Sequence, residues 1–202
     1  IIIATLHTWG ENLMLHPHVH ILVSSGGLAE DGSWHHGSEN YLCDVKELSA
    51  DFKKRFLRRF KRLYKRGKLQ KAENFDKIYD DMDGVDWVVH SKKPFAGAEN
   101  VLKYLSRYVY RSAIANSRIE AIENSGITFD SKDYNDKDED DIPAHKPITL
   151  KPMDFILRFM LHILPKGFRR SRFYGAFAGV TRKENIEHCR ELFSKELEKL
   201  AA

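Results

Sequence analysis

The feature of this chain that most constrains its fold is a pair of histidines at the start of an apolar run. The segment 16–20 reads H-P-H-V-H and continues directly into I-L-V-S-S-G-G-L. Apolar, β-branched residues closed by a double glycine are typical of a strand, and we predict one over residues 18–25. Residues i and i+2 of a strand point to the same face. His18 and His20 are therefore expected to stand side by side on one surface of a sheet.

Two neighbouring imidazoles are suited to binding a divalent metal ion, such as Mg²⁺ or Mn²⁺ when an oxygen ligand assists. Two ligands are too few for a stable site. Glu11 is our first choice for the third, because it is the nearest carboxylate before the strand, and His7 is the second choice. The alternative is that the H-x-H pair arises by chance among ten histidines and is partly buried and hydrogen-bonded.

A second cluster consists of two tyrosines one helical turn apart. The segment 101–108 reads V-L-K-Y-L-S-R-Y, and we predict a helix over residues 97–109 that carries Tyr104 and Tyr108. A phenol has an intrinsic pKa near 10 and is a poor nucleophile unless a cation or a base assists it. Lys103, Arg107 and Arg111 could stabilise a phenolate and hold a phosphate nearby. The alternative is that both rings belong to an apolar stripe that faces the core.

A third signal is a helix with charge of one sign. Between residues 53 and 68 there are ten Lys or Arg and no acid, and aromatic residues recur at helical spacing from Phe52 to Tyr64. We predict a helix here with Ser49 as its N-cap. A polyanion such as the phosphate backbone of DNA would relieve the repulsion between these cations. The alternative is an ordinary solvated face.

The remaining sequence predicts an α+β fold, with a central antiparallel sheet and helices packed on it. Further strands are expected over residues 1–8 and 86–90 and around a turn at 124–126, and helices over 153–164 and from 182. Seven acids against two lysines over residues 130–141 predict an acidic surface loop.

Length and composition favour one domain over residues 1–202, and no apolar run approaches the roughly 20 residues of a membrane span. The chain opens without Met in a predicted strand, so we expect a piece of a longer protein that is truncated at its N-terminus. Cys43 and Cys189 are far apart, which excludes a disulfide scaffold and favours a reducing cytosol.

Longer segments carry a family resemblance. The chain resembles the two-tyrosine rolling-circle transposases of the insertion-sequence-ninety-one family, which are HUH (His-hydrophobic-His) endonucleases. The resemblance covers about residues 5–182 and rests on these segments in order: H-P-H-V-H-I-L-V with G-G-L, K-K-P-F-A-G-A-E-N-V-L-K-Y-L-S-R-Y, A-I-A-N-S-R-I, and F-I-L-R-F-M-L-H-I-L-P-K-G-F-R-R-S-R-F-Y-G. It implies that His18 and His20 form the HUH element and supports Glu11 as the residue that completes the metal site. It also implies an HUH-like fold and a nucleophile pair of Tyr104 and Tyr108.

The resemblance implies a metal-dependent enzyme of the bacterial cytosol, associated with the nucleoid. It would nick single-stranded DNA at transposon ends and transfer strands through 5′-phosphotyrosine intermediates. Lys103, Arg107, Arg111 and Arg118 are the expected phosphate contacts, and Arg169, Arg170 and Arg172 could extend them. Two alternatives remain, a metal-dependent phosphoesterase that uses water and an inactive DNA-binding remnant. No membrane partner is expected.

Overall fold

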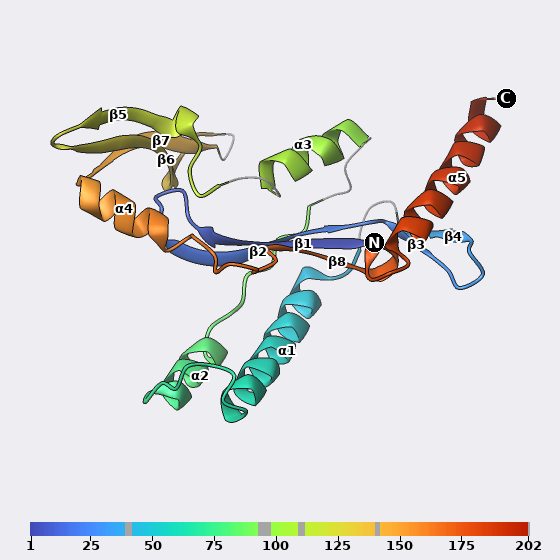
Figure 1. The fold of residues 1–202 in the computed structure, drawn as a ribbon, viewed down its shortest axis with the longest axis horizontal. Helices are drawn as coiled ribbons and strands as arrows, with labels where there is room; N and C mark the ends of the chain where they lie inside the picture. The colour runs from blue at the N-terminus through green and yellow to red at the C-terminus, as the bar shows by residue number, and fades with distance from the viewer. Residues whose placement is uncertain (39–41, 93–97, 109–111, 140–141, 202) are drawn as a thin grey trace. The chain divides into compact units, whose positions relative to one another are not determined.

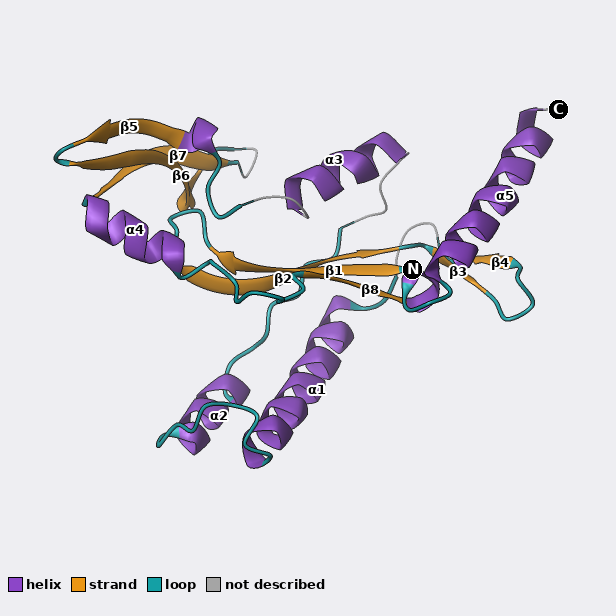
Figure 2. Ribbon diagram, viewed as in Figure 1, coloured by secondary structure: helices purple, strands orange, loops and turns teal. Residues whose placement is uncertain are grey.

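The computed structural model describes residues 1–38, 42–92, 98–108, 112–139 and 142–201 (Figure 1). Its helices and antiparallel strands confirm the predicted α+β class (Figure 2). The chain divides into two compact units, where the sequence led us to expect one catalytic domain. Unit 1 comprises Ile1–His36 and Phe95–Ala202, and unit 2 comprises Gly37–Pro94.

A three-stranded antiparallel sheet in unit 1 carries the histidines. Its central strand is β1 (Ile2–Trp9), flanked by β2 (Leu15–Val23) and β8 (Ser171–Tyr174). The strands predicted over residues 1–8 and 18–25 are confirmed, whereas β8 was not predicted. The chain continues from β2 into a short hairpin of β3 (Gly26–Leu28) and β4 (Trp34–His36).

A second antiparallel sheet in unit 1 has the order β5 (Ile119–Glu123), β6 (Gly126–Lys137) and β7 (Pro143–Leu150). Helix α4 (Pro152–Met160) lies alongside this sheet (Figure 1). The buried core lies between the end of β1 and this sheet, where burial of apolar surface stabilises the fold. It consists of Trp9, Leu13, Ala113, Ile114 and Phe129.

The loop predicted over residues 130–141 is wrong for its first two thirds, which continue strand β6 as far as Lys137. Side chains on β7 offset the charge of the acids opposite them. Lys146 Nζ lies 2.9 Å from an Asp133 carboxylate oxygen and 3.1 Å from one of Asp136. His145 Nδ1 lies 2.7 Å from Asp130 Oδ2. Residues 140–141 lie outside the described part of the chain.

Unit 2 is built on α1 (Val45–Lys65) and α2 (Phe75–Asp83). The predicted aromatic stripe of α1 is confirmed: its rings stack on Phe75 and pack at an angle against Trp87. The ring centroids of Tyr64 and Phe75 are 3.5 Å apart, and those of Phe56 and Trp87 are 5.0 Å apart. This packing leaves the basic residues of α1 on the outside of the unit.

Two local predictions in unit 2 are wrong. The N-cap of α1 is Asp44, whose carboxylate accepts hydrogen bonds from the backbone N–H groups of Lys46 and Glu47, so the helix begins before Ser49. Residues 86–90 form no strand. Trp87 Nε1 instead donates to the carbonyl of Met82 over 3.0 Å, and the indole packs on α1.

Two further helices belong to unit 1, α3 (Ala98–Tyr108) and α5 (Arg182–Ala201), both close to their predicted positions. Among the described residues, no helix combines the length and the apolar character that crossing a membrane requires.

Candidate metal and tyrosine site

Strand pairing brings three histidines to one face of the first sheet. In the antiparallel register of β1 and β2, His7 lies directly opposite His18, and Thr5 lies opposite His20. Directly opposed residues share a face, and residues two apart on one strand share it too. His7 is therefore the cross-strand neighbour of His18 and the diagonal neighbour of His20.

The three imidazoles form the group of side chains, among the described residues, whose geometry suits a metal ion. One ring nitrogen from each of His7, His18 and His20 lies within 4.8 Å of the other two. Their ring centroids are 4.5 to 5.4 Å apart. Three nitrogen donors on a rigid sheet suit a first-row transition ion, with water and substrate oxygens completing the coordination.

The hydrogen bond of His18 fixes which of its nitrogens can bind a metal. His18 Nδ1 lies 2.8 Å from the backbone carbonyl oxygen of His16. A carbonyl oxygen only accepts, so Nδ1 carries the proton and Nε2 holds the lone pair. Metal-binding histidines commonly show this arrangement, in which the second ring nitrogen donates to a carbonyl.

His7 is held in place by its strand neighbour Trp9. The two rings stack with centroids 4.5 Å apart and planes 17° from parallel, and His7 is only 3% exposed. Trp9 in turn contacts the core around Leu13 and Phe129. The third imidazole is thus fixed by the same packing that stabilises the unit.

His20 is neutral at physiological pH. Burial, together with the neighbouring His7 and His18, lowers the pKa of His20 from 6.5 to about 4. Removal from water disfavours the charged imidazolium, and each nearby imidazole opposes it further. A neutral imidazole is the form that binds a metal, so this environment prepares the ligand.

Tyr104 lies beside this cluster. Its hydroxyl oxygen is 3.4 Å from His20 Nδ1, and the two ring centroids are 6.3 Å apart. The partly buried Tyr104 comes from α3, some 84 residues along the chain from His20. The structure therefore brings one of the predicted tyrosines together with the predicted histidine pair.

The other residues predicted around Tyr104 are described only in part. The backbone of Tyr108 and Arg107 continues α3, but their side chains, and all of Arg111, lie outside the described residues. Lys103 Nζ pairs with Glu99 one helical turn away, over 2.8 Å, and both side chains are largely exposed.

Glu11 and Arg118 contact each other, whereas we predicted a metal ligand and a phosphate contact. Arg118 Nη1 lies 3.1 Å from Glu11 Oε2, and its Nε donates to the carbonyl of Asp130 over 2.9 Å. The Arg118 side chain is 11% exposed and lies over the ring of Phe129. This pair joins the turn after β1 to β6, and His7, the second choice from the sequence, completes the imidazole cluster in place of Glu11.

His162 illustrates a histidine whose role is structural. Its Nδ1 lies 3.1 Å from Thr8 Oγ1, its Nε2 lies 3.0 Å from the carbonyl oxygen of Leu13, and it is 8% exposed. Both ring nitrogens are therefore engaged with β1 and the turn that follows it. The basic segment with Arg169, Arg170 and Arg172 leads into and forms part of β8, and Arg170 lies over the Trp9 ring at 5.8 Å.

Comparisons with known proteins show similarity to transposases. Residues 2–185 match a family model, Y2_Tnp, described as "Putative transposase". The chain is 39% identical over 199 residues to "Putative transposase y4qJ" of Sinorhizobium fredii, covering 94% of this chain and 49% of that protein. It is 30% identical over 195 residues to "Transposase for insertion sequence element IS801" of Pseudomonas savastanoi, covering 88% and 43%.

The chain thus spans about half the length of the curated relatives that it matches. No solved structure matches it. Because the family match covers nearly the whole chain, the chain belongs to the Y2_Tnp transposase family.

Proposed function

We propose that this chain is the catalytic part of a metal-dependent transposase of the two-tyrosine HUH class. It nicks single-stranded DNA at transposon ends and transfers strands through 5′-phosphotyrosine intermediates, as in rolling-circle transposition. The observation that carries this proposal is the 3.4 Å approach of the Tyr104 hydroxyl to His20, a member of the imidazole cluster. A phenol and a metal-binding group at one place are the parts that nicking by tyrosine requires.

The donor set favours Mn²⁺ or a related transition ion over Mg²⁺, because Mg²⁺ prefers oxygen ligands. His7, His18 and His20 would hold the ion. When bound, it would withdraw negative charge from the scissile phosphate and make the phosphorus easier to attack.

The Tyr104 oxygen attacks the phosphorus in line with the departing 3′ oxygen. The Tyr104 O–P bond forms as the P–O3′ bond breaks, the phenol loses its proton, and the 3′ oxygen gains one. The product is a 5′-phosphotyrosine and a free 3′-OH. The new ester conserves the free energy of the broken phosphodiester, so a second hydroxyl can reverse the step and join strands without ATP.

Tyr108 is the proposed second nucleophile. It follows Tyr104 by one turn of α3, so the two phenols could hold two cut ends in succession. Lys103, Arg107 and Arg111 are the proposed phosphate contacts along this helix and the segment after it. We place the reaction in the bacterial cytosol, where the DNA substrate lies in the nucleoid.

The experiment is incubation of the protein with 3′-labelled single-stranded DNA from a transposon end and Mn²⁺, followed by a denaturing gel. We expect a covalent protein–DNA band that EDTA abolishes. Tyr104→Phe should remove most of the adduct of the first cut, and the double variant with Tyr108→Phe should remove all of it. Tyr134→Phe, an exposed tyrosine on β6, is the matched control and should leave the adduct unchanged.

The two alternatives from the sequence give different gels. Cleavage without a covalent band would indicate a phosphoesterase that uses water. Binding without cleavage would indicate an inactive remnant. Either result would overturn the proposed strand transfer.

A further inference from the structure

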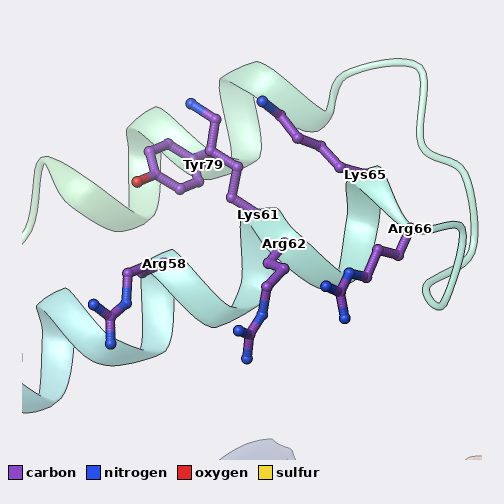
Figure 3. Close-up of a pocket in the computed structure, with 6 residues that line it drawn as sticks. All are labelled: Arg58, Lys61, Arg62, Lys65, Arg66 and Tyr79. Carbon is purple, nitrogen blue, oxygen red and sulfur yellow. The ribbon is translucent and has the colours of Figure 1, made fainter.

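The outer face of α1 in unit 2 carries five cations around a hollow. Arg58, Lys61, Arg62, Lys65 and Arg66 line it together with Tyr79 of α2, and its volume is about 490 Å³ (Figure 3). Figure 3 shows the three arginines extending to one side of α1 and the two lysines extending toward α2. Residues four apart on a helix are about 6 Å apart along its axis, so the cations form two regular rows.

These cations differ from three other basic residues of unit 2, which pair with carboxylates. Arg55 pairs with Asp51 over 2.5 Å, Lys77 pairs with Asp81 over 2.7 Å, and Lys53 lies 3.5 Å from Asp83. Within the described part of the chain, the five cations around the hollow form no ion pair. Five exposed like charges repel one another, and that repulsion is relieved only when a polyanion binds.

The positively charged face continues along the helix. A second hollow of about 460 Å³ shares Arg58 and Tyr79 with the first and adds Lys54, together with Lys53 and its partner Asp83. From Lys54 to Arg66 the track is about 18 Å long at 1.5 Å per residue. A duplex presents a phosphate every 3.4 Å on each strand, so this length faces about five phosphates of one strand.

The aromatic residue in the hollow does not offer an open ring for base stacking. Lys61 Nζ lies over the Tyr79 ring, 4.8 Å from its centroid, and Phe60 and Tyr64 of α1 stack on Phe75. Within this hollow, charge around a ring already covered by Lys61 favours contact with phosphates over contact with bases.

We propose that this α1 face is a second DNA-contact surface, which binds the phosphodiester backbone without reading sequence. It would supply affinity in unit 2 that is separate from the cleavage chemistry of unit 1. The choice of DNA as the polyanion rests on the proposed function, whereas the phosphate-binding chemistry rests on α1 itself.

The test measures binding of the full chain to fluorescein-labelled 30-nucleotide single strands and 30-base-pair duplexes by anisotropy, in EDTA and over a series of KCl concentrations. The test variant is Arg58→Gln with Arg62→Gln. The matched control is Arg55→Gln with Lys77→Gln, which removes the same charge from the same unit at residues paired with carboxylates.

We expect the test variant to raise Kd at about 100 mM KCl by about 10-fold or more and the control by less than about 2-fold. The slope of log K against log [KCl] should shrink by about 1.4 for single strands and about 1.8 for duplexes when two phosphate contacts are lost. Lys61→Gln with Lys65→Gln removes the other row and should act similarly, and it keeps the test valid if the arginine variant fails to fold.

Equal losses in test and control variants would show an effect of net charge alone and would overturn the proposal, as would no loss in either. Because these measurements need no metal, they are independent of the nicking assay. Binding that depends on α1 in a protein that cuts nothing would leave this surface standing and refute the proposed function. Nicking by a protein whose DNA binding does not depend on α1 would refute this surface and leave the proposed function standing.

Discussion

At the residue scale, the proposed metal site has either His7 or Glu11 as its third ligand, and the two choices predict different effects of mutation. We predict that His7→Ala lowers Mn²⁺ affinity by about 100-fold or more, since the loss of a direct ligand should exceed the about 10- to 100-fold cost of losing an outer-shell partner. Glu11→Gln should leave the affinity within about 3-fold, because Glu11 contacts Arg118. Isothermal titration calorimetry measures both, with His145→Ala as the control. Equal losses for Glu11→Gln and His7→Ala would contradict the imidazole cluster.

Arg118 is a second residue whose contacts suggest a test, because it pairs with Glu11. We predict that Arg118→Met destabilises the fold by about 3 kcal/mol, because it leaves the partly buried Glu11 carboxylate without its partner. Urea unfolding measures this loss. The salt dependence of DNA binding should not change, whereas a direct phosphate contact would reduce the slope by about 1. An unchanged free energy of unfolding together with a reduced salt slope of DNA binding would show that Arg118 contacts phosphate, as expected from the sequence.

At the scale of elements, local patterns predicted those whose apolar spacing or turn residues lie within one short segment. The apolar runs of β1 and β2, the turn between β5 and β6, and the tyrosine helix α3 follow this rule. The segment 86–90 resembles a strand, yet Trp87 packs on the aromatic face of α1 and leaves the backbone without a strand partner. The acidic segment continues as a strand beside β7, where Lys146 pairs with Asp133 and Asp136, and no local pattern reveals this pairing.

The start of α1 provides an element-scale prediction. Asp44→Ala should cost about 1 kcal/mol, because it removes the carboxylate that accepts from the N–H groups of Lys46 and Glu47. Asp44→Asn should retain most of this stability, since Asn caps helices about as well. Thermal unfolding followed by circular dichroism measures both. A loss for the Asn variant equal to that of the Ala variant would show that capping is not the cause.

At the scale of the whole molecule, the site depends on contacts far apart in sequence. The sequence identified His18, His20 and Tyr104, because each belongs to a recognisable local motif. It ranked His7 below Glu11, since only the register of β1 against β2 places His7 opposite His18. The division into two units was likewise missed, because helix α2, which packs against α1, carries no strong sequence signal.

The pH dependence of stability is a property of the whole fold. His20 has a pKa of about 4 in the folded chain against 6.5 when unfolded, so the unfolded chain binds more protons between these values. In EDTA, stability should be unaffected by His20 above about pH 6.5 and should fall as the pH drops from 6.5 toward 4. The decline should be shallower in His20→Gln, as measured by urea unfolding at a series of pH values. Identical profiles for both proteins would show that His20 is not buried as described.

The central claim is that the phenol beside the imidazole cluster is the nucleophile, and peptide mapping of the covalent adduct tests it most directly. Trypsin cuts after Lys103, Arg107 and Arg111, so Tyr104 and Tyr108 fall in the separate peptides Y-L-S-R and Y-V-Y-R. After one cut of single-stranded DNA and nuclease trimming, mass spectrometry should find the 5′-phosphonucleotide on Y-L-S-R. An adduct confined to Y-V-Y-R or to any other peptide would contradict the account.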